Sequence, residues 1–132
     1  MKEHFQGLGH IAVYTQDIDA SIAFYENIGG ALLKRGAVTT PDGEKKLALV
    51  DFGGVTLELI QSPTPVPTGE GNLPHFAVYV DDIDATAAAI RAAGVDTFLT
   101  PQKRVVPSLF GGLENWFFTG PSGEQIELLK ML

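Results

Sequence analysis

Two stretches of this chain combine a strand-like pattern and a helix-like pattern in the same order. Residues 9–15 and 75–80 are rich in Val, Tyr, Ile and Phe, which predicts a short β-strand in each place. An aspartate follows each strand, and apolar residues then recur every three or four positions, as on one face of a helix. We predict that Asp17 and Asp82 cap these helices, because a carboxylate can accept the free N–H groups of a first turn. Glycines at positions 29, 30 and 94 are expected to end them.

Three further strand-like segments follow each predicted helix. They cover residues 31–35, 46–52 and 55–61 in the first half, and residues 97–100, 115–119 and 125–131 in the second. Hairpin turns are predicted at Asp42-Gly43, Gly53-Gly54 and Ser122-Gly123, since such pairs favour tight turns. Each half is therefore predicted to be a βαβββ unit.

The two halves are also related in sequence. At an offset of 65 positions, eleven of the twenty-two residues from 8 to 29 are identical to their partners from 73 to 94. Self-similarity at a fixed offset indicates a duplicated structural unit. We predict an α+β fold in which one domain, residues 1–132, holds module 1 at 5–62, module 2 at 74–132 and a linker at 63–73. The linker contains three prolines, which lack the N–H donors of a central strand.

Four chemically competent residues occupy equivalent positions in the halves. His10 and His75 begin the first strand of each half, and Glu58 and Glu127 lie in the last strand. Alternation places both glutamates on the face of the sheet opposite their leucine and isoleucine neighbours. An unpaired carboxylate is costly to bury in an apolar strand, and shared binding of a divalent cation would remove that cost. The other interpretation is structural, which we favour for His4 because it has no partner in the repeat.

Composition narrows the chemistry of such a site. The chain has 132 residues, no cysteine and a formal net charge of −7. A metal must therefore be held by nitrogen and oxygen atoms, and Ni²⁺, Co²⁺, Zn²⁺ or Mn²⁺ suit two imidazoles and two carboxylates. The acidic balance argues against nucleic acid as a partner. No apolar run is long enough for a membrane span and no signal peptide is evident, so a cytoplasmic protein is expected.

These segments together resemble the vicinal oxygen chelate superfamily, which includes glyoxalase I, methylmalonyl-CoA epimerase, extradiol dioxygenases and the bleomycin and fosfomycin resistance proteins. The resemblance rests on Gly-His10-Ile-Ala-Val, Leu-Glu58-Leu, Pro-His75-Phe-Ala-Val and Gly-Glu-Gln-Ile-Glu127-Leu. It implies that the two modules form an incomplete β-barrel around a cleft. The order His, Glu, His, Glu is most similar to bacterial glyoxalase I, which implies one divalent metal per chain bound by His10, Glu58, His75 and Glu127.

The chain departs from glyoxalase I at two positions. The resemblance implies an arginine four residues after the first histidine and an asparagine four residues after the first glutamate, but Tyr14 and Ser62 stand there. Tyrosine cannot replace the bidentate clamp that arginine forms on a carboxylate. We therefore predict that glutathione adducts are poor substrates. Lys103 and Arg104 are either contacts for an anionic substrate or a solvated basic pair.

The predicted function is that of a metal-dependent lyase or isomerase of the glyoxalase I type, acting by proton transfer on a small α-oxygenated carbonyl compound or its thiol adduct. An epimerase with the same chemistry is one alternative. The other is a metal-free binding protein of the bleomycin resistance kind. Four aromatic residues are candidates for lining its cleft: Tyr14, Tyr79, Phe110 and Trp116. Core packing is the alternative for Trp116 and for the two tyrosines.

The catalytic base is expected to be one of the two glutamates. The resemblance to glyoxalase I implies that Glu127 leaves the metal and collects the substrate proton, with Glu58 as its rival. A homodimer is expected, because twofold assembly is common and covers the edges of the sheets. The sequence leaves open whether the cleft forms within one chain or across two.

Overall fold

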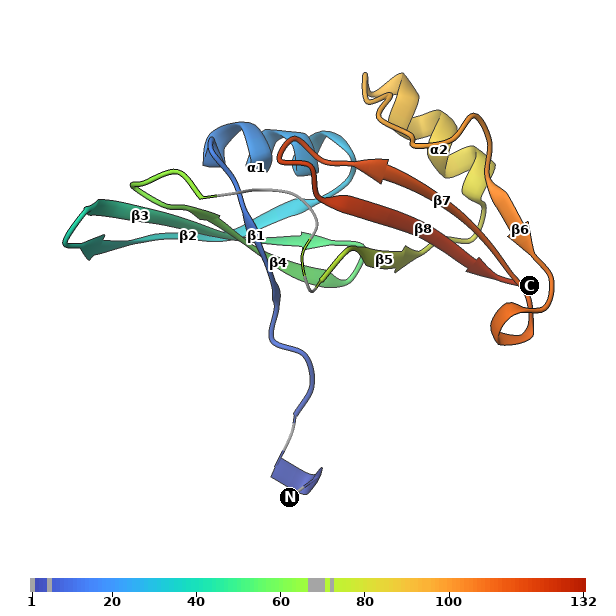
Figure 1. Ribbon diagram of the computed structural model, residues 1–132, viewed down its shortest axis with the longest axis horizontal. Coiled ribbons are helices and arrows are strands. Elements are labelled where there is room, and N and C mark those ends of the chain that lie inside the picture. Colours follow the sequence, from blue (N-terminus) through green and yellow to red (C-terminus); the bar gives the residue numbers. More distant parts are fainter. Residues whose placement is uncertain (1, 5, 67–70, 72) are drawn as a thin grey trace.

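Each half of the chain folds into a four-stranded sheet covered by one helix (Figure 1). The structure is a computed structural model, and it describes residues 2–4, 6–66, 71 and 73–132. Module 1 contains β1 (Ile11–Tyr14), α1 (Ile18–Asn27), β2 (Ala31–Thr40), β3 (Gly43–Phe52) and β4 (Val55–Gln61). Module 2 contains β5 (Phe76–Tyr79), α2 (Ile83–Ala92), β6 (Arg104–Val106), β7 (Leu113–Thr119) and β8 (Gln125–Met131). Part of the expected linker, residues 67–70 and 72, lies outside the described residues.

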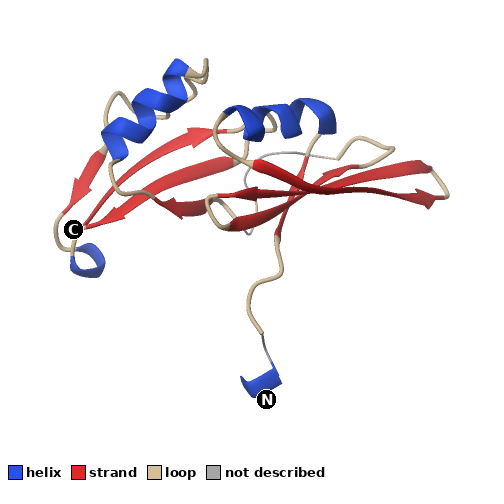
Figure 2. Cartoon of the chain, turned by 180° about the vertical axis from the view of Figure 1, so that it is seen from behind, coloured by secondary structure: helices blue, strands red, loops and turns tan. Residues whose placement is uncertain are grey.

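The two sheets have the same topology. Their strand orders are β1-β4-β3-β2 and β5-β8-β7-β6, with the first pair parallel and the others antiparallel. This repetition confirms the predicted pair of βαβββ modules. The sheets are open and separate, and both helices lie on the same side of them (Figure 2). Neither described helix is long and apolar enough to cross a membrane.

The helices begin and end where the sequence predicts. The Asp17 and Asp82 carboxylates each accept a hydrogen bond of 3.0 Å, from the backbone N–H groups of Ala20 and Ala85. Gly29 and Gly94, just beyond the helix ends, adopt φ values of 102° and 92°. These left-handed conformations are costly for residues with a Cβ atom, so glycine suits both positions.

Two predicted strands differ from the structure. Residues 97–100 do not form a strand, because only Phe98 makes a β-bridge, to Phe118, and Pro101 then removes a donor. The outer strand of module 2 is instead β6. In module 1, β2 extends to Thr40, five residues beyond the predicted end at Arg35. This part of the β2–β3 hairpin is mostly exposed, so its sequence does not alternate between buried and exposed positions.

The core lies between the helices and one face of each sheet. Leu57, Leu59, Ile126 and Leu128 are at most 1% exposed and pack with the buried faces of α1 and α2. Their alternation leaves Glu58 and Glu127 on the opposite face, as predicted. The N-terminal segment also leaves the sheets on this helix-free side (Figure 1). This face, which we call the open face, is where the candidate site lies.

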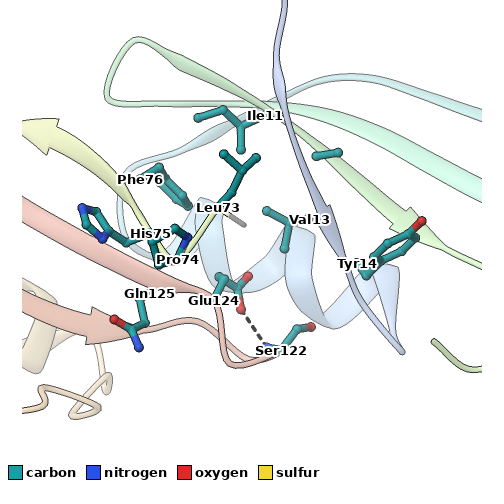
Figure 3. A pocket seen from close by; sticks show the side chains of 11 residues that line it. Ile11, Val13, Tyr14, Leu73, Pro74, His75, Phe76, Ser122, Glu124 and Gln125 are labelled. Carbon is teal, nitrogen blue, oxygen red and sulfur yellow. Dashed lines mark hydrogen bonds between the residues drawn. The ribbon is translucent and has the colours of Figure 1, made fainter. Parts of the chain in front are cut away.

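Polar contacts join the two modules. Tyr25 of α1 is fully buried, and its phenol donates a hydrogen bond of 2.8 Å to Glu124, which precedes β8. Glu124 also accepts the Ser122 N–H at 2.8 Å (Figure 3). A Cβ atom on Gly120 would overlap the Glu124 carboxylate, so glycine at this position allows the carboxylate its close approach. Asn27 adds a hydrogen bond of 2.8 Å to the Ala93 carbonyl.

The buried hydrogen bond between Tyr25 and Glu124 predicts that the stability of the fold falls at alkaline pH. Burial, and then the neighbouring Glu124 carboxylate, raise the pKa of the Tyr25 phenol well above its ordinary value near 10. The contribution of Tyr25 to stability is therefore complete below about pH 10 and is lost as the pH rises, because the unfolded phenol releases a proton that the folded one retains. The loss should be about 1.4 kcal/mol per pH unit.

Urea unfolding of the wild type and of Tyr25→Phe from pH 9 to 11.5 measures this effect. Tyr25→Phe should be less stable than the wild type at pH 8. Above pH 10 its free energy of unfolding should fall less steeply with pH, because its unfolding releases one proton fewer per chain. Tyr14→Phe, at an exposed tyrosine, is the control and should retain the wild-type slope. Parallel curves for the wild type and Tyr25→Phe would show that the phenol is not linked to folding.

Candidate metal-binding site

Each module holds one histidine close to its glutamate. His10 Nε2 lies 3.5 Å from Glu58 Oε1, and His75 Nε2 lies 3.3 Å from Glu127 Oε1. In each case the histidine precedes the edge strand, β1 or β5, and the glutamate lies in the parallel neighbour, β4 or β8. The shared topology of the modules therefore builds the same His–Glu pair twice on the open face.

The two pairs differ in burial. The Glu58 side chain is 24% exposed and the Glu127 side chain 11% exposed, while the two histidines retain 44% and 39% exposure. Each pair thus presents an accessible imidazole beside a more enclosed carboxylate. A small ion or ligand can approach both pairs from the open face.

The donor atoms of each pair suit a divalent metal. Imidazole nitrogen and carboxylate oxygen bind Zn²⁺ and similar ions at about 2 Å, so two donors roughly 3 Å apart can share one ion. A pair supplies only two ligands, however. Within the described part of the chain, no three histidine, aspartate or glutamate side chains gather as a metal site. A single chain therefore presents the four predicted ligands as two separate half-sites.

The pair of His75 and Glu127 has neighbouring side chains that hold it in place. Asn115 of β7 donates a hydrogen bond of 2.8 Å from Nδ2 to Glu127 Oε2, and both side chains are buried. The ring of Phe117 meets the His75 ring edge-on, with centroids 5.1 Å apart. Sequence analysis missed Asn115, although its polar side chain at an alternating position of a buried strand was a detectable signal.

A hollow with a basic side chain borders each pair. One, of about 220 Å³, is lined by His75, Asn115, Phe117 and Arg104 of the outer strand β6. The other, of about 290 Å³, is lined by His10, Glu58, Leu47 and Lys34 of the outer strand β2. A substrate held at either pair would therefore have a cation within the same hollow.

The two neighbouring residues of the predicted basic pair, Lys103 and Arg104, make different contacts. Lys103 forms ion pairs with Asp84 at 2.7 Å and Glu114 at 3.1 Å. Hydrogen bonds to these carboxylates raise the pKa of the Lys103 ammonium, which stabilises the loop before β6 as a charged anchor. Arg104 instead lines the hollow beside His75. Arg104 is thus the member of the pair that is placed to meet an anion.

Three of the four aromatic candidates are exposed. Tyr14 and Tyr79 end β1 and β5, and Phe110 lies in a short 3₁₀ turn with a φ of 50°. Tyr79 borders a hollow that is also lined by Ala89 and Ile90 of α2. Trp116 is buried against Phe98, its Nε1 donates to the Thr100 carbonyl at 3.1 Å, and it also lines the hollow beside His75. A cavity of about 140 Å³ lies where the modules meet, with Tyr14 and His75 on opposite sides of it (Figure 3).

Known proteins are similar to this chain in sequence or in fold. The model of the Glyoxalase/Bleomycin resistance protein/Dioxygenase superfamily matches residues 7–128. The uncharacterized protein YwbC of Bacillus subtilis is 33% identical over 129 residues, covering 93% of this chain and 96% of its own. A "probable lactoylglutathione lyase" of Vibrio parahaemolyticus is 32% identical over 127 residues, covering 92% and 88%.

A solved structure supports the fold. The fosfomycin resistance protein FosX of Listeria monocytogenes gives a TM-score of 0.72 at 19% identity, covering 97% of this chain and 95% of its own. A second structure of FosX, in complex with Mn(II) and sulfate, gives a TM-score of 0.66. Because the family model spans nearly the whole chain, this protein belongs to the Glyoxalase/Bleomycin resistance protein/Dioxygenase superfamily.

Proposed function

We propose that this protein is a metal-dependent lyase or isomerase that moves a proton on a small α-oxygenated carbonyl compound or its thiol adduct. The observation that carries the proposal is the pair of equivalent His–Glu half-sites on the open face. The Vibrio relative described as a probable lactoylglutathione lyase supports the reaction class. The FosX complex with Mn(II) supports the use of a divalent ion within this fold.

The complete site in this proposal forms across a homodimer. His10 and Glu58 of one subunit would face the partner subunit's His75 and the partner subunit's Glu127, and the twofold axis would create two such sites. The open face supports this arrangement, because it has no covering helix and leaves both histidines partly exposed. Closed twofold assembly brings different parts of identical chains together in this way.

The chemistry of the proposal divides between ion and protein. A divalent ion held by the four ligands supplies positive charge where a carbonyl oxygen becomes negative. One glutamate takes the proton from the carbon beside the carbonyl, and the C–H electron pair moves toward that oxygen. The same carboxylate returns the proton to the former carbonyl carbon, while the hydroxyl proton of the first carbon passes to the former carbonyl oxygen. The first carbon becomes the new carbonyl, so no oxidant or reductant is needed. Return of the proton to the original carbon from the other side would make the protein an epimerase.

A metal-free binding protein is the second candidate. The exposed aromatic side chains Tyr14, Tyr79 and Phe110 favour it, since aromatic surfaces bind aromatic ligands without a metal. Metal content separates the two functions. Under the enzymatic proposal, protein purified without chelators or a nickel column should bind one Ni²⁺, Co²⁺, Zn²⁺ or Mn²⁺ per chain, measured by elemental analysis after dialysis against each ion.

The same preparations should exchange hydrogen for deuterium from D₂O at the carbon beside the carbonyl in hemithioacetals of methylglyoxal with a panel of small thiols. His4→Ala, at an exposed histidine outside both pairs, is the control and should bind the wild-type amount of metal. A wild-type protein that binds none of the four ions would support the binding protein instead.

A further inference from the structure

The two repeat-related glutamates are held differently. Glu127 uses both oxygens, because Oε1 faces His75 and Oε2 accepts the Asn115 amide hydrogen bond. Glu58 faces His10 through Oε1, and no second side-chain donor to it is found among the described residues. The Glu58 side chain is also about twice as exposed. The duplication has therefore produced one fixed carboxylate and one less constrained carboxylate.

The strand register explains the difference. Glu127 pairs with Phe117, and Asn115 lies two residues before Phe117 on the same face of β7. In module 1 Glu58 pairs with Leu49, so the equivalent position two residues earlier in β3 is Leu47. A leucine cannot donate a hydrogen bond to the glutamate beside it. The exchange of Leu47 for Asn115 between the repeats is thus sufficient to make the glutamates inequivalent.

The environment of Asn115 indicates that this hydrogen bond is more than a packing contact. The Asn115 side chain is buried, and its Oδ1 atom has no hydrogen-bond partner. A buried acceptor without a partner costs free energy that a leucine of similar size would not incur. If packing alone mattered at this position, the leucine of module 1 would serve better. The favourable feature of Asn115 is the donor that it presents to Glu127.

We propose that Asn115 is a positioning residue that fixes Glu127 as a permanent metal ligand, so that Glu58 is the carboxylate that leaves the ion and takes the substrate proton. This inference rests on the proposed metal-dependent function. It reverses the roles that the sequence resemblance implies for the two glutamates. A ligand must exchange with substrate before it can act as the base, and the more constrained carboxylate is the less able to do so.

Reciprocal substitutions test the role of Asn115. Asn115→Leu gives module 2 the residue of module 1, and Leu47→Asn gives module 1 the residue of module 2. Titration with Co²⁺ alone should show affinity reduced about 10-fold to 100-fold in Asn115→Leu, as expected for loss of a residue that orients a ligand. Leu47→Asn should bind Co²⁺ at least as tightly as the wild type.

A vicinal oxygen chelator tests which glutamate leaves. Acetohydroxamate added to the Co²⁺ protein should displace Glu58 and leave Glu127 bound. A crystal structure of this ternary complex would show which glutamate has left the ion. In Leu47→Asn, where an amide retains Glu58, acetohydroxamate should bind about tenfold more weakly, the size expected for one hydrogen bond to a carboxylate. The visible spectrum of Co²⁺ follows both binding steps without any substrate.

The outcomes separate this inference from the proposed function. If the wild type does not bind Co²⁺, the metal-dependent function fails. If the wild type binds Co²⁺ and folded Asn115→Leu binds it equally well, or if acetohydroxamate displaces Glu127, the function stands and the role of Asn115 is wrong. Thermal unfolding without metal identifies a misfolded Asn115→Leu protein. In that case acetohydroxamate binding by Leu47→Asn and the crystal structure of the wild-type ternary complex test the inference.

Discussion

Two variants that each lack one half-site are expected to restore metal binding when they are mixed. The first variant carries His10→Ala and Glu58→Ala, and the second carries His75→Ala and Glu127→Ala. Each variant alone leaves two ligands per site and should lose bound Co²⁺ or Ni²⁺. In a mixed dimer, one site contains all four ligands and the other contains none, because the intact pairs come from different chains.

The expected recovery follows from random exchange of subunits. A 1:1 mixture that is unfolded and refolded together yields mixed dimers as about half of all dimers, so about one quarter of the wild-type sites should bind metal. Metal analysis after gel filtration measures this fraction, with each variant refolded alone as the control. A site built within one chain would show no recovery, and full metal binding by either variant alone would exclude both pairs acting together.

Glutathione is expected to be a poor thiol for this protein. Tyr14 is exposed and stands where the glyoxalase I resemblance implies an arginine, and Ser62 follows β4 where it implies an asparagine. Loss of a bidentate ion pair with the glutathione carboxylate costs about 2.7 kcal/mol, or two orders of magnitude in kcat/KM. A glyoxalase assay with methylglyoxal and glutathione, with Ni²⁺ and separately with Zn²⁺, measures this activity.

A gain of activity is the matched test. The double variant Tyr14→Arg and Ser62→Asn should raise kcat/KM for the glutathione hemithioacetal by at least about tenfold, because it restores a carboxylate clamp. Tyr79→Arg, at the equivalent residue of the second module, is the control for added charge. Wild-type turnover approaching the diffusional ceiling near 10⁸ M⁻¹s⁻¹ would contradict the prediction and identify glutathione as a natural co-substrate.

Local patterns in the sequence determined most of the fold. The duplicated strand, aspartate cap and amphipathic helix predicted both βαβββ modules, and Asp17 and Asp82 cap the helices as expected. Alternation along β4 and β8 placed Glu58 and Glu127 on the face opposite the core. These features depend on burial with a period of two or 3.6 residues, which a single sequence displays directly. The turn of the β2–β3 hairpin was predicted, but the outer parts of its strands and β6 were not, because their exposed residues show no such period.

Tertiary structure alone decided how the candidate ligands are held. The hydrogen bond from Asn115 to Glu127 depends on the register between β7 and β8, and the bond from Tyr25 to Glu124 joins residues 99 positions apart. Periodicity reports which face a side chain occupies but not which neighbour it meets across strands. The docking of the modules likewise leaves their His–Glu pairs separate within a chain. Sequence therefore determined the four candidate ligands, while packing between strands and modules decided their partners and their grouping into two half-sites.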